Sequence, residues 1–240
     1  ALADKLETLV GLFGIGNLPT GDKDPFALRR HALGVVRMLV ERALPLQPDV
    51  LVRQAFGVFP NGMLQHDVEP LSQFLVDRLK GYLKDTGYLN GEVEAAIHAQ
   101  GLDTWAELPK RLNAVRAFAA LPEAPALAAA NKRIGNILKK VPPVDPHVSE
   151  LLLAAPAEKD LYAAMCRVVP EAGAQFDRGD FAASLQTLAA LRAPVDAFFE
   201  GVMVNAPELD LRLNRQGLLQ ALHDAMNRVA DLSRLDSPGA

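Results

Sequence analysis

The last part of this 240-residue chain repeats its apolar residues at helical spacing, and this pattern restricts the fold more than any other feature. Pro194 suits the first turn of a short helix, because proline has no amide proton to leave unpaired there. After a break at Pro207, a longer pattern runs to Leu235. Both patterns predict amphipathic helices. Their apolar residues are Val195, Phe198, Phe199, Val202 and Met203 in the first, and Leu209, Leu213, Leu218, Leu222, Met226 and Val229 in the second.

Composition extends this prediction to the whole chain. Leu and Ala dominate, Ile is scarce and no sustained apolar/polar alternation occurs, so the sequence predicts an all-α fold. Half of the residues are hydrophobic, which is enough for a sizeable core. The net charge of −4 argues against a protein that holds nucleic acid by bulk electrostatics. Any contact with nucleic acid must therefore be local.

The sequence predicts a succession of helices separated by short breaks. Asp24 and Pro25 supply an N-terminal cap and a first-turn proline for a helix that runs to about Leu44. The proline-rich segment 141–146 is the clearest break and requires extended backbone. The predicted helices cover residues 1–13, 25–44, 49–57, 67–85, 91–99, 104–119, 124–140, 147–154, 156–169, 180–191, 194–203 and 207–235.

Five segments resemble known proteins. Residues 130–140 (ANKRIGNILKK), 194–204 (PVDAFFEGVMV) and 211–215 (LRLNR) resemble the DALR-type anticodon-binding domain that glycyl- and arginyl-tRNA synthetases share. Residues 1–13 (ALADKLETLVGLF) and 22–30 (DKDPFALRR) resemble the beta-subunit family of two-subunit bacterial glycyl-tRNA synthetase. We therefore identify the chain as similar to a C-terminal fragment of that family, which agrees with its lack of an initiator Met.

The resemblance implies three parts: the end of an HD-like helical domain at 1–44, a helical body at 45–112, and an α-helical anticodon-binding bundle at 113–240. It implies that the fragment binds tRNA(Gly) in the cytoplasm and positions it for the alpha subunit of an α2β2 enzyme. By the same resemblance, the ATP- and magnesium-dependent ligase chemistry belongs to the alpha subunit. We expect no catalytic site, cofactor or metal in this fragment.

Basic residues at two places are the candidates for contact with tRNA. In the segment 130–140, four cations fall on the side of a helical wheel opposite Ile134, Ile137 and Leu138. Such a strip would contact phosphates, and an ordinary solvated surface is the competing interpretation. The resemblance adds two arginines near the start of the last predicted helix. The complete predicted set is Asn131, Lys132, Arg133, Lys139, Lys140, Arg212 and Arg215.

Reading the anticodon requires other residue types. The two cytosines of glycine anticodons carry exocyclic amines, so a reader needs hydrogen-bond acceptors and stacking surfaces. Asp196, Glu200, Phe198 and Phe199 are candidates, although both Phe residues lie on an apolar face that favours core packing. Two alternatives remain for the whole chain: the anticodon-binding region of arginyl-tRNA synthetase, or a helical scaffold that binds only protein.

The remaining signatures predict no site. Cys166 lies in an apolar helical context and is expected in the core. Asp4 resembles the last metal ligand of HD-type phosphohydrolases, but the upstream His motifs are missing, and His31 and His66-Asp67 follow it in the wrong order. No run approaches the ~18 apolar residues of a membrane span.

Overall fold

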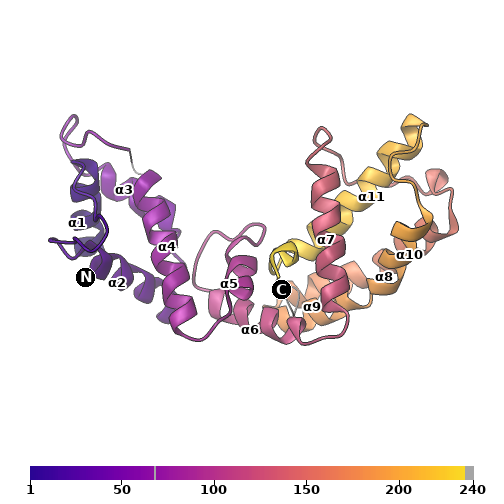
Figure 1. Cartoon of the computed structure of the whole chain (residues 1–240), viewed down its shortest axis with the longest axis horizontal. Helices are drawn as coiled ribbons and strands as arrows, with labels where there is room; N and C mark the ends of the chain where they lie inside the picture. Colours follow the sequence, from indigo (N-terminus) through magenta and orange to yellow (C-terminus); the bar gives the residue numbers. More distant parts are fainter. Residues whose placement is uncertain (68, 236–240) are drawn as a thin grey trace. The chain divides into compact units, whose positions relative to one another are not determined.

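The computed structural model describes residues 1–67 and 69–235 (Figure 1). Within these residues the chain is 66% helical, with 11 α-helices and no strand. The predicted all-α fold is confirmed. None of the helices in the described part of the chain is both long enough and apolar enough to cross a membrane.

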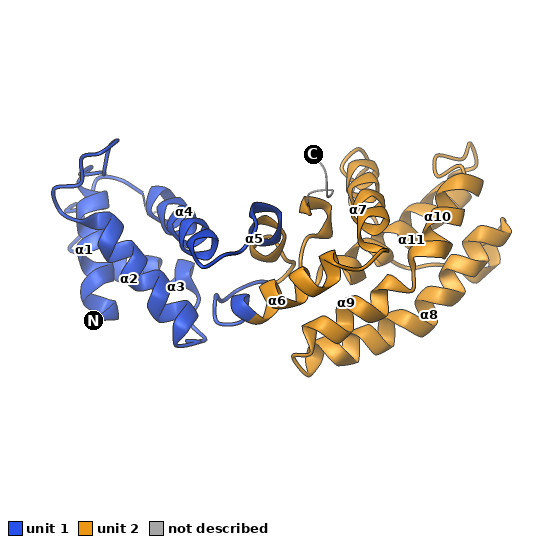
Figure 2. Cartoon of the chain, turned by 60° about the horizontal axis from the view of Figure 1, so that its bottom comes forward, with its two compact units in different colours: residues 1–93, 102–109 blue, residues 94–101, 110–240 orange. Residues whose placement is uncertain are grey.

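The chain divides into two compact units (Figure 2). Unit 1 comprises residues 1–93 and 102–109, and unit 2 comprises residues 94–101 and 110–240. The boundary runs through α5 (Asn90–Ile97) and the start of α6 (Leu108–Ala119). The domain boundaries predicted above rest on resemblance and stay predictions.

Unit 1 contains α1 (Leu2–Gly14), α2 (Leu28–Glu41), α3 (Pro48–Phe56) and α4 (Glu69–Asp85). α1 packs against the other three, and α4 also packs against α2 and α3. Leu9, Leu39 and Leu75 are fully buried in this packing. Each recurs with apolar neighbours three or four residues away, which is the period that places them on one face.

The start of α2 differs from the prediction. The N-cap residue is Ala27 rather than the expected Asp24, although the Asp24 carboxylate accepts the backbone N–H of Leu28 at 2.8 Å and of Arg29 at 3.0 Å. Ala27 has a left-handed backbone with φ of 53°, which no α-helix continues through. The helix therefore begins at Leu28 rather than at Pro25.

Unit 2 carries the remaining elements. They are α7 (Ala124–Leu138), η1 (Glu150–Leu152), α8 (Pro156–Asp177), α9 (Phe181–Ala189), α10 (Arg192–Gly201), α11 (Leu209–Asn227) and η2 (Leu232–Arg234). α8 packs against α9, α10 and α11, while α7 packs against α10, α11 and η2 (Figures 1 and 2). Ile134, Leu161, Phe198 and Leu222 are fully buried between these helices.

Three predictions about α8 and its surroundings are wrong. The helix continues through Pro170 to Asp177. The proline removes one backbone hydrogen bond, but packing of α8 against α9 stabilises the turn that follows it. Ser184 of α9 strengthens that packing, since its hydroxyl donates to the Ala172 carbonyl at 2.9 Å. Cys166 is exposed rather than buried. The predicted helix at 147–154 is reduced to the short η1.

The predicted apolar faces near the chain's end are only partly buried. Val195, Phe198, Leu218 and Leu222 are buried as expected. Met203, Leu209 and Leu213 are instead 68%, 56% and 50% exposed. α10 ends at Gly201, before Met203, and the first two turns of α11 carry the two exposed leucines.

Candidate nucleic-acid interface

Four of the predicted cations lie on the exposed side of α7 and of the turn that follows it. We call Lys132, Arg133, Lys139 and Lys140 the α7 strip; all four are exposed. The opposite side of the helix is buried against its neighbours through Leu127 and Ile134. None of the four cations forms an ion pair with any residue that the structure describes. Their charge therefore remains available to an anionic ligand.

Asn131 is fully buried, although the sequence pattern placed it among the tRNA contacts. Its side-chain amide donates to Asn227 at 2.8 Å and accepts from Asn227 at 3.1 Å. Asn227 also donates to the His223 carbonyl at 2.7 Å. A side chain with no accessible surface cannot contact RNA directly. The expectation is corrected: Asn131 positions α7 against α11.

Arg133 contacts an aromatic ring. Its guanidinium carbon lies 4.2 Å from the centroid of the Phe199 ring on α10, a cation–π contact. Phe199 is half-buried and Phe198 is fully buried, so core packing is confirmed for Phe198. Phe199 supports the strip from beneath, a role that the sequence analysis did not foresee.

Arg215 is not a surface charge. It is 9% exposed and forms an ion pair with Glu158, which is fully buried at the start of α8. Its Nη1 also donates to the Met203 carbonyl at 2.8 Å, and the second carboxylate oxygen of Glu158 accepts the Ala155 N–H at 2.7 Å. The expectation that Arg215 faces solvent is wrong. Its charge is used to join α8, α11 and the connector that follows α10.

Arg212 serves the same connector. The side chain is half-buried, and its Nη1 donates to the Ala206 carbonyl at 3.0 Å. The two arginines therefore hold residues 203–206 against the first turns of α11. A tRNA role for Arg212 stays a prediction, but one of its donors is already occupied.

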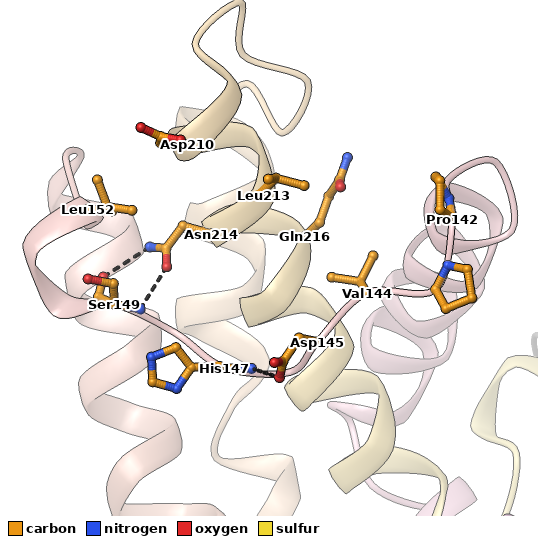
Figure 3. A pocket seen from close by; sticks show the side chains of 11 residues that line it. Pro142, Val144, Asp145, His147, Ser149, Leu152, Asp210, Leu213, Asn214 and Gln216 are labelled. Carbon is orange, nitrogen blue, oxygen red and sulfur yellow. Dashed lines mark hydrogen bonds between the residues drawn. The ribbon is translucent and has the colours of Figure 1, made fainter.

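The loop after the α7 strip is attached to α11 by two residues that the sequence analysis missed. Asn214, 7% exposed, accepts the Ser149 N–H at 2.7 Å and donates to the Ser149 carbonyl at 3.1 Å (Figure 3). Gly217 lets the loop approach, because a Cβ there would lie 2.6 Å from the His147 carbonyl oxygen. The available signal was a Gly inside a helical pattern, between Gln216 and Leu218.

His223 lies on the side of α11 that faces α7. A Cβ added to Gly135 of α7 would lie 3.7 Å from its Nε2, so imidazole and helix are in contact. Partial burial lowers the pKa of His223 below its usual 6.5; Asp224 and Asp231 oppose this, and the positive charge of Lys139 adds to it. The imidazole is therefore neutral at pH 7, which leaves the α7 strip as the local positive charge.

The other candidates are only partly explained by the structure. Asp196 is paired with Arg192 at 3.3 Å on α10, while Glu200 is exposed. Neither observation identifies Asp196 or Glu200 as a residue that recognises a base. Among the described residues, no group of three or more His, Cys, Asp or Glu side chains could hold a metal ion.

The chain is similar to known proteins of one kind. A family model described as "Glycyl-tRNA synthetase beta subunit" matches residues 1–98. Glycine–tRNA ligase beta subunits of Polaromonas naphthalenivorans (strain CJ2), Acidovorax sp. (strain JS42) and Delftia acidovorans (strain DSM 14801 / SPH-1) are 70%, 67% and 61% identical to it. Each similarity covers 98% of this chain. The chain spans about a third of the length of these relatives, 33%, 32% and 33%.

Proposed function

The predicted resemblance to glycyl-tRNA synthetase beta subunits is confirmed, and from that premise we propose that this chain is a tRNA-binding part of such a subunit. The α7 strip is the observation that carries the proposal. It offers four exposed cations that pair with no acidic side chain among residues 1–67 and 69–235, in a chain whose net charge is −4. Binding through such a strip is local, as the composition requires.

The strip suits phosphate contacts rather than base recognition. Lysine and arginine side chains on one helix face fix the position of a nucleic-acid backbone but carry no sequence information. Arg133 is partly ordered by Phe199 before RNA arrives, which lowers the entropy that binding would cost. The strip would thus orient the tRNA, while other residues read its anticodon.

The proposed role is positioning, and the chemistry is assigned to a partner. An alpha subunit would carry ATP, magnesium and the glycyl transfer, in the cytoplasm and in an α2β2 assembly. Holding the tRNA so that its acceptor end reaches that site replaces an encounter in solution by an oriented one, which contributes many orders of magnitude to rate in favourable cases. No step of the transfer is placed on this chain.

A double charge reversal tests the proposal. Lys132→Glu with Arg133→Glu should weaken binding of tRNA(Gly) and reduce the slope of log affinity against log salt by about 0.7 per lost contact. The matched control is Lys159→Glu with Arg167→Glu on α8, which are also exposed and change the net charge equally. Equal effects of the two pairs, or no tRNA binding by the unchanged chain, would contradict the proposal.

A protein-binding scaffold is the second candidate, and one observation favours it. Leu151, Leu209 and Leu213 are 97%, 56% and 50% exposed in unit 2, and exposed apolar groups of this kind mark protein interfaces. Tight binding to the alpha subunit without any affinity for tRNA would support it. The relatives speak against the arginyl-tRNA synthetase alternative, since they are glycine–tRNA ligase beta subunits.

A further inference from the structure

The loop that follows α3 contains an Asn–Gly pair in a β-turn (Figure 1). The Met63 N–H donates to the Pro60 carbonyl at 3.1 Å, and Gly62 has a φ of 80°. Residues 60–63 therefore correspond to a type II turn with glycine at its third position. Pro60, Asn61, Gly62 and Met63 are all exposed. The Asn–Gly pair is thus open to solvent, outside any helix.

Residues on both sides of this turn are anchored to α1. A Cβ added to Gly11 would lie 3.2 Å from the Phe59 ring, and one added to Gly14 would lie 2.7 Å from the Leu64 side chain. Both side chains therefore pack directly on the helix. The Gly14 carbonyl also accepts the Gln65 N–H at 2.7 Å. A change confined to the turn leaves these contacts in place.

An Asn–Gly pair carries its own nucleophile and electrophile. The backbone nitrogen of the glycine attacks the side-chain carbonyl carbon of the asparagine, and a five-membered succinimide forms. The C–N bond of the side-chain amide breaks, and its nitrogen leaves as ammonia with the proton that the attacking nitrogen loses. Water then opens the ring at either carbonyl, which gives aspartate or isoaspartate. Glycine hinders the attack least, because it has no Cβ.

Gly62 leaves this reaction unobstructed. Its N–H donates to no group among residues 1–67 and 69–235. Apart from its chain neighbours, no heavy atom lies within 4 Å of the position that a Cβ on Gly62 would occupy. The backbone rotation that closes the ring therefore breaks no hydrogen bond of Gly62 and displaces no packed side chain.

The second Asn–Gly pair of the sequence lies in the opposite environment. Asn90 and Gly91 are the first two residues of α5, and Gly91 is buried. The Glu92 carboxylate accepts the Leu89 N–H at 2.9 Å, which holds the start of the helix. Ring closure at Asn90 requires its backbone to leave the helical conformation, so the first turn of α5 must open. The chain thus provides an internal control for the effect of structure.

We infer that Asn61 is a site of spontaneous deamidation and isoaspartate formation in the folded chain, while α5 protects Asn90. Asparagine is among the thermolabile residues, and the reaction consumes only water. Each event adds one carboxylate to the turn, which is ionised at neutral pH. The isoaspartyl product also routes the main chain through Cβ, one atom longer than before. Unit 1 remains folded, because its anchors to α1 lie outside the turn.

The test is incubation of the folded chain in mildly alkaline buffer, followed by proteolysis and mass spectrometry against an unincubated sample. The Asn61 peptide should change from amide mass to acid mass at least about tenfold faster than the Asn90 peptide, a ratio that corresponds to ~1.4 kcal/mol between the two barriers. An isoaspartate methyltransferase should label the Asn61 peptide and leave the Asn90 peptide unlabelled. Thermal unfolding should be unchanged by the modification.

Two controls identify the cause. In urea, which unfolds α5, the rates at Asn61 and Asn90 should become similar. Asn61→Gln should abolish the mass change in the turn, because the corresponding ring is six-membered and closes more slowly. Equal rates at the two sites in the folded chain would overturn the inference, and so would an Asn61 that reacts only after unfolding. A mass change that persists in the Asn61→Gln variant would also overturn it.

Discussion

α7 and the start of α11 carry basic residues in similar patterns, yet the structure uses them in opposite ways. The α7 strip is exposed and has no ion pair within the described residues, whereas Arg215 is buried against Glu158 and Arg212 binds the Ala206 carbonyl. The difference arises from what covers each helix. The loop after α7 and the connector 203–206 lie over the first turns of α11, and backbone carbonyls in both segments need hydrogen-bond donors. An arginine that is predicted to face solvent instead stabilises the fold when a loop covers it and its guanidinium binds backbone carbonyls.

The largest expected effect concerns the buried ion pair. Glu158→Ala should destabilise unit 2 by about 3–5 kcal/mol, because it leaves the Arg215 guanidinium buried without its counter-charge. Urea unfolding measures the change. Asp177→Ala removes the exposed partner of Arg228 and should cost only ~0–1 kcal/mol. Similar losses in both variants would show that Arg215 behaves as a surface residue, and the contrast between α7 and α11 would disappear.

A pair of glycine substitutions should sharpen the same contrast with opposite signs. Gly217→Ala on α11 places a Cβ 2.6 Å from the His147 carbonyl oxygen, so the loop must shift at a cost of about 1–3 kcal/mol. Gly135→Ala on α7 meets only His223 at 3.7 Å and should stabilise the helix by up to about 1 kcal/mol. Thermal unfolding of both variants provides the measurement. Stabilisation by Gly217→Ala would mean that the loop does not rest on α11.

The smallest effect is a pH dependence at the contact between the two helices. The pKa of His223 is lowered in the folded state. Below about pH 6.5, His223 therefore binds a proton more readily in the unfolded chain than in the folded chain. Stability from this group is therefore complete above that pH and is lost as the pH falls. His223→Gln should lose less thermal stability than the unchanged chain between about pH 7.5 and 5.5. Equal losses of thermal stability in the variant and the unchanged chain would show that His223 does not cause the pH dependence.

Sequence reasoning located most helices because their apolar residues recur over several turns, as in α1 and α4. It ended α8 too early, since a rule for Pro170 in isolation ignores the packing that carries the helix onward. The helical wheel of residues 130–140 alone predicted the exposed α7 strip. The burial of Arg215 did not, because its partner Glu158 is 57 residues away and only the tertiary fold brings them together.

The amide pair between Asn131 and Asn227 also has a consequence for how this sequence can vary. The two side chains exchange two hydrogen bonds across 96 residues of chain, and both residues are buried. Changing Asn227 leaves the buried Asn131 amide without a partner among the described residues, a loss of about 1–3 kcal/mol, whereas after a change of Asn131 the Asn227 amide keeps its bonds to the His223 carbonyl and the Leu232 N–H. The two positions are therefore not equivalent: Asn131 depends on Asn227 alone, whereas Asn227 also joins α11 to the start of η2.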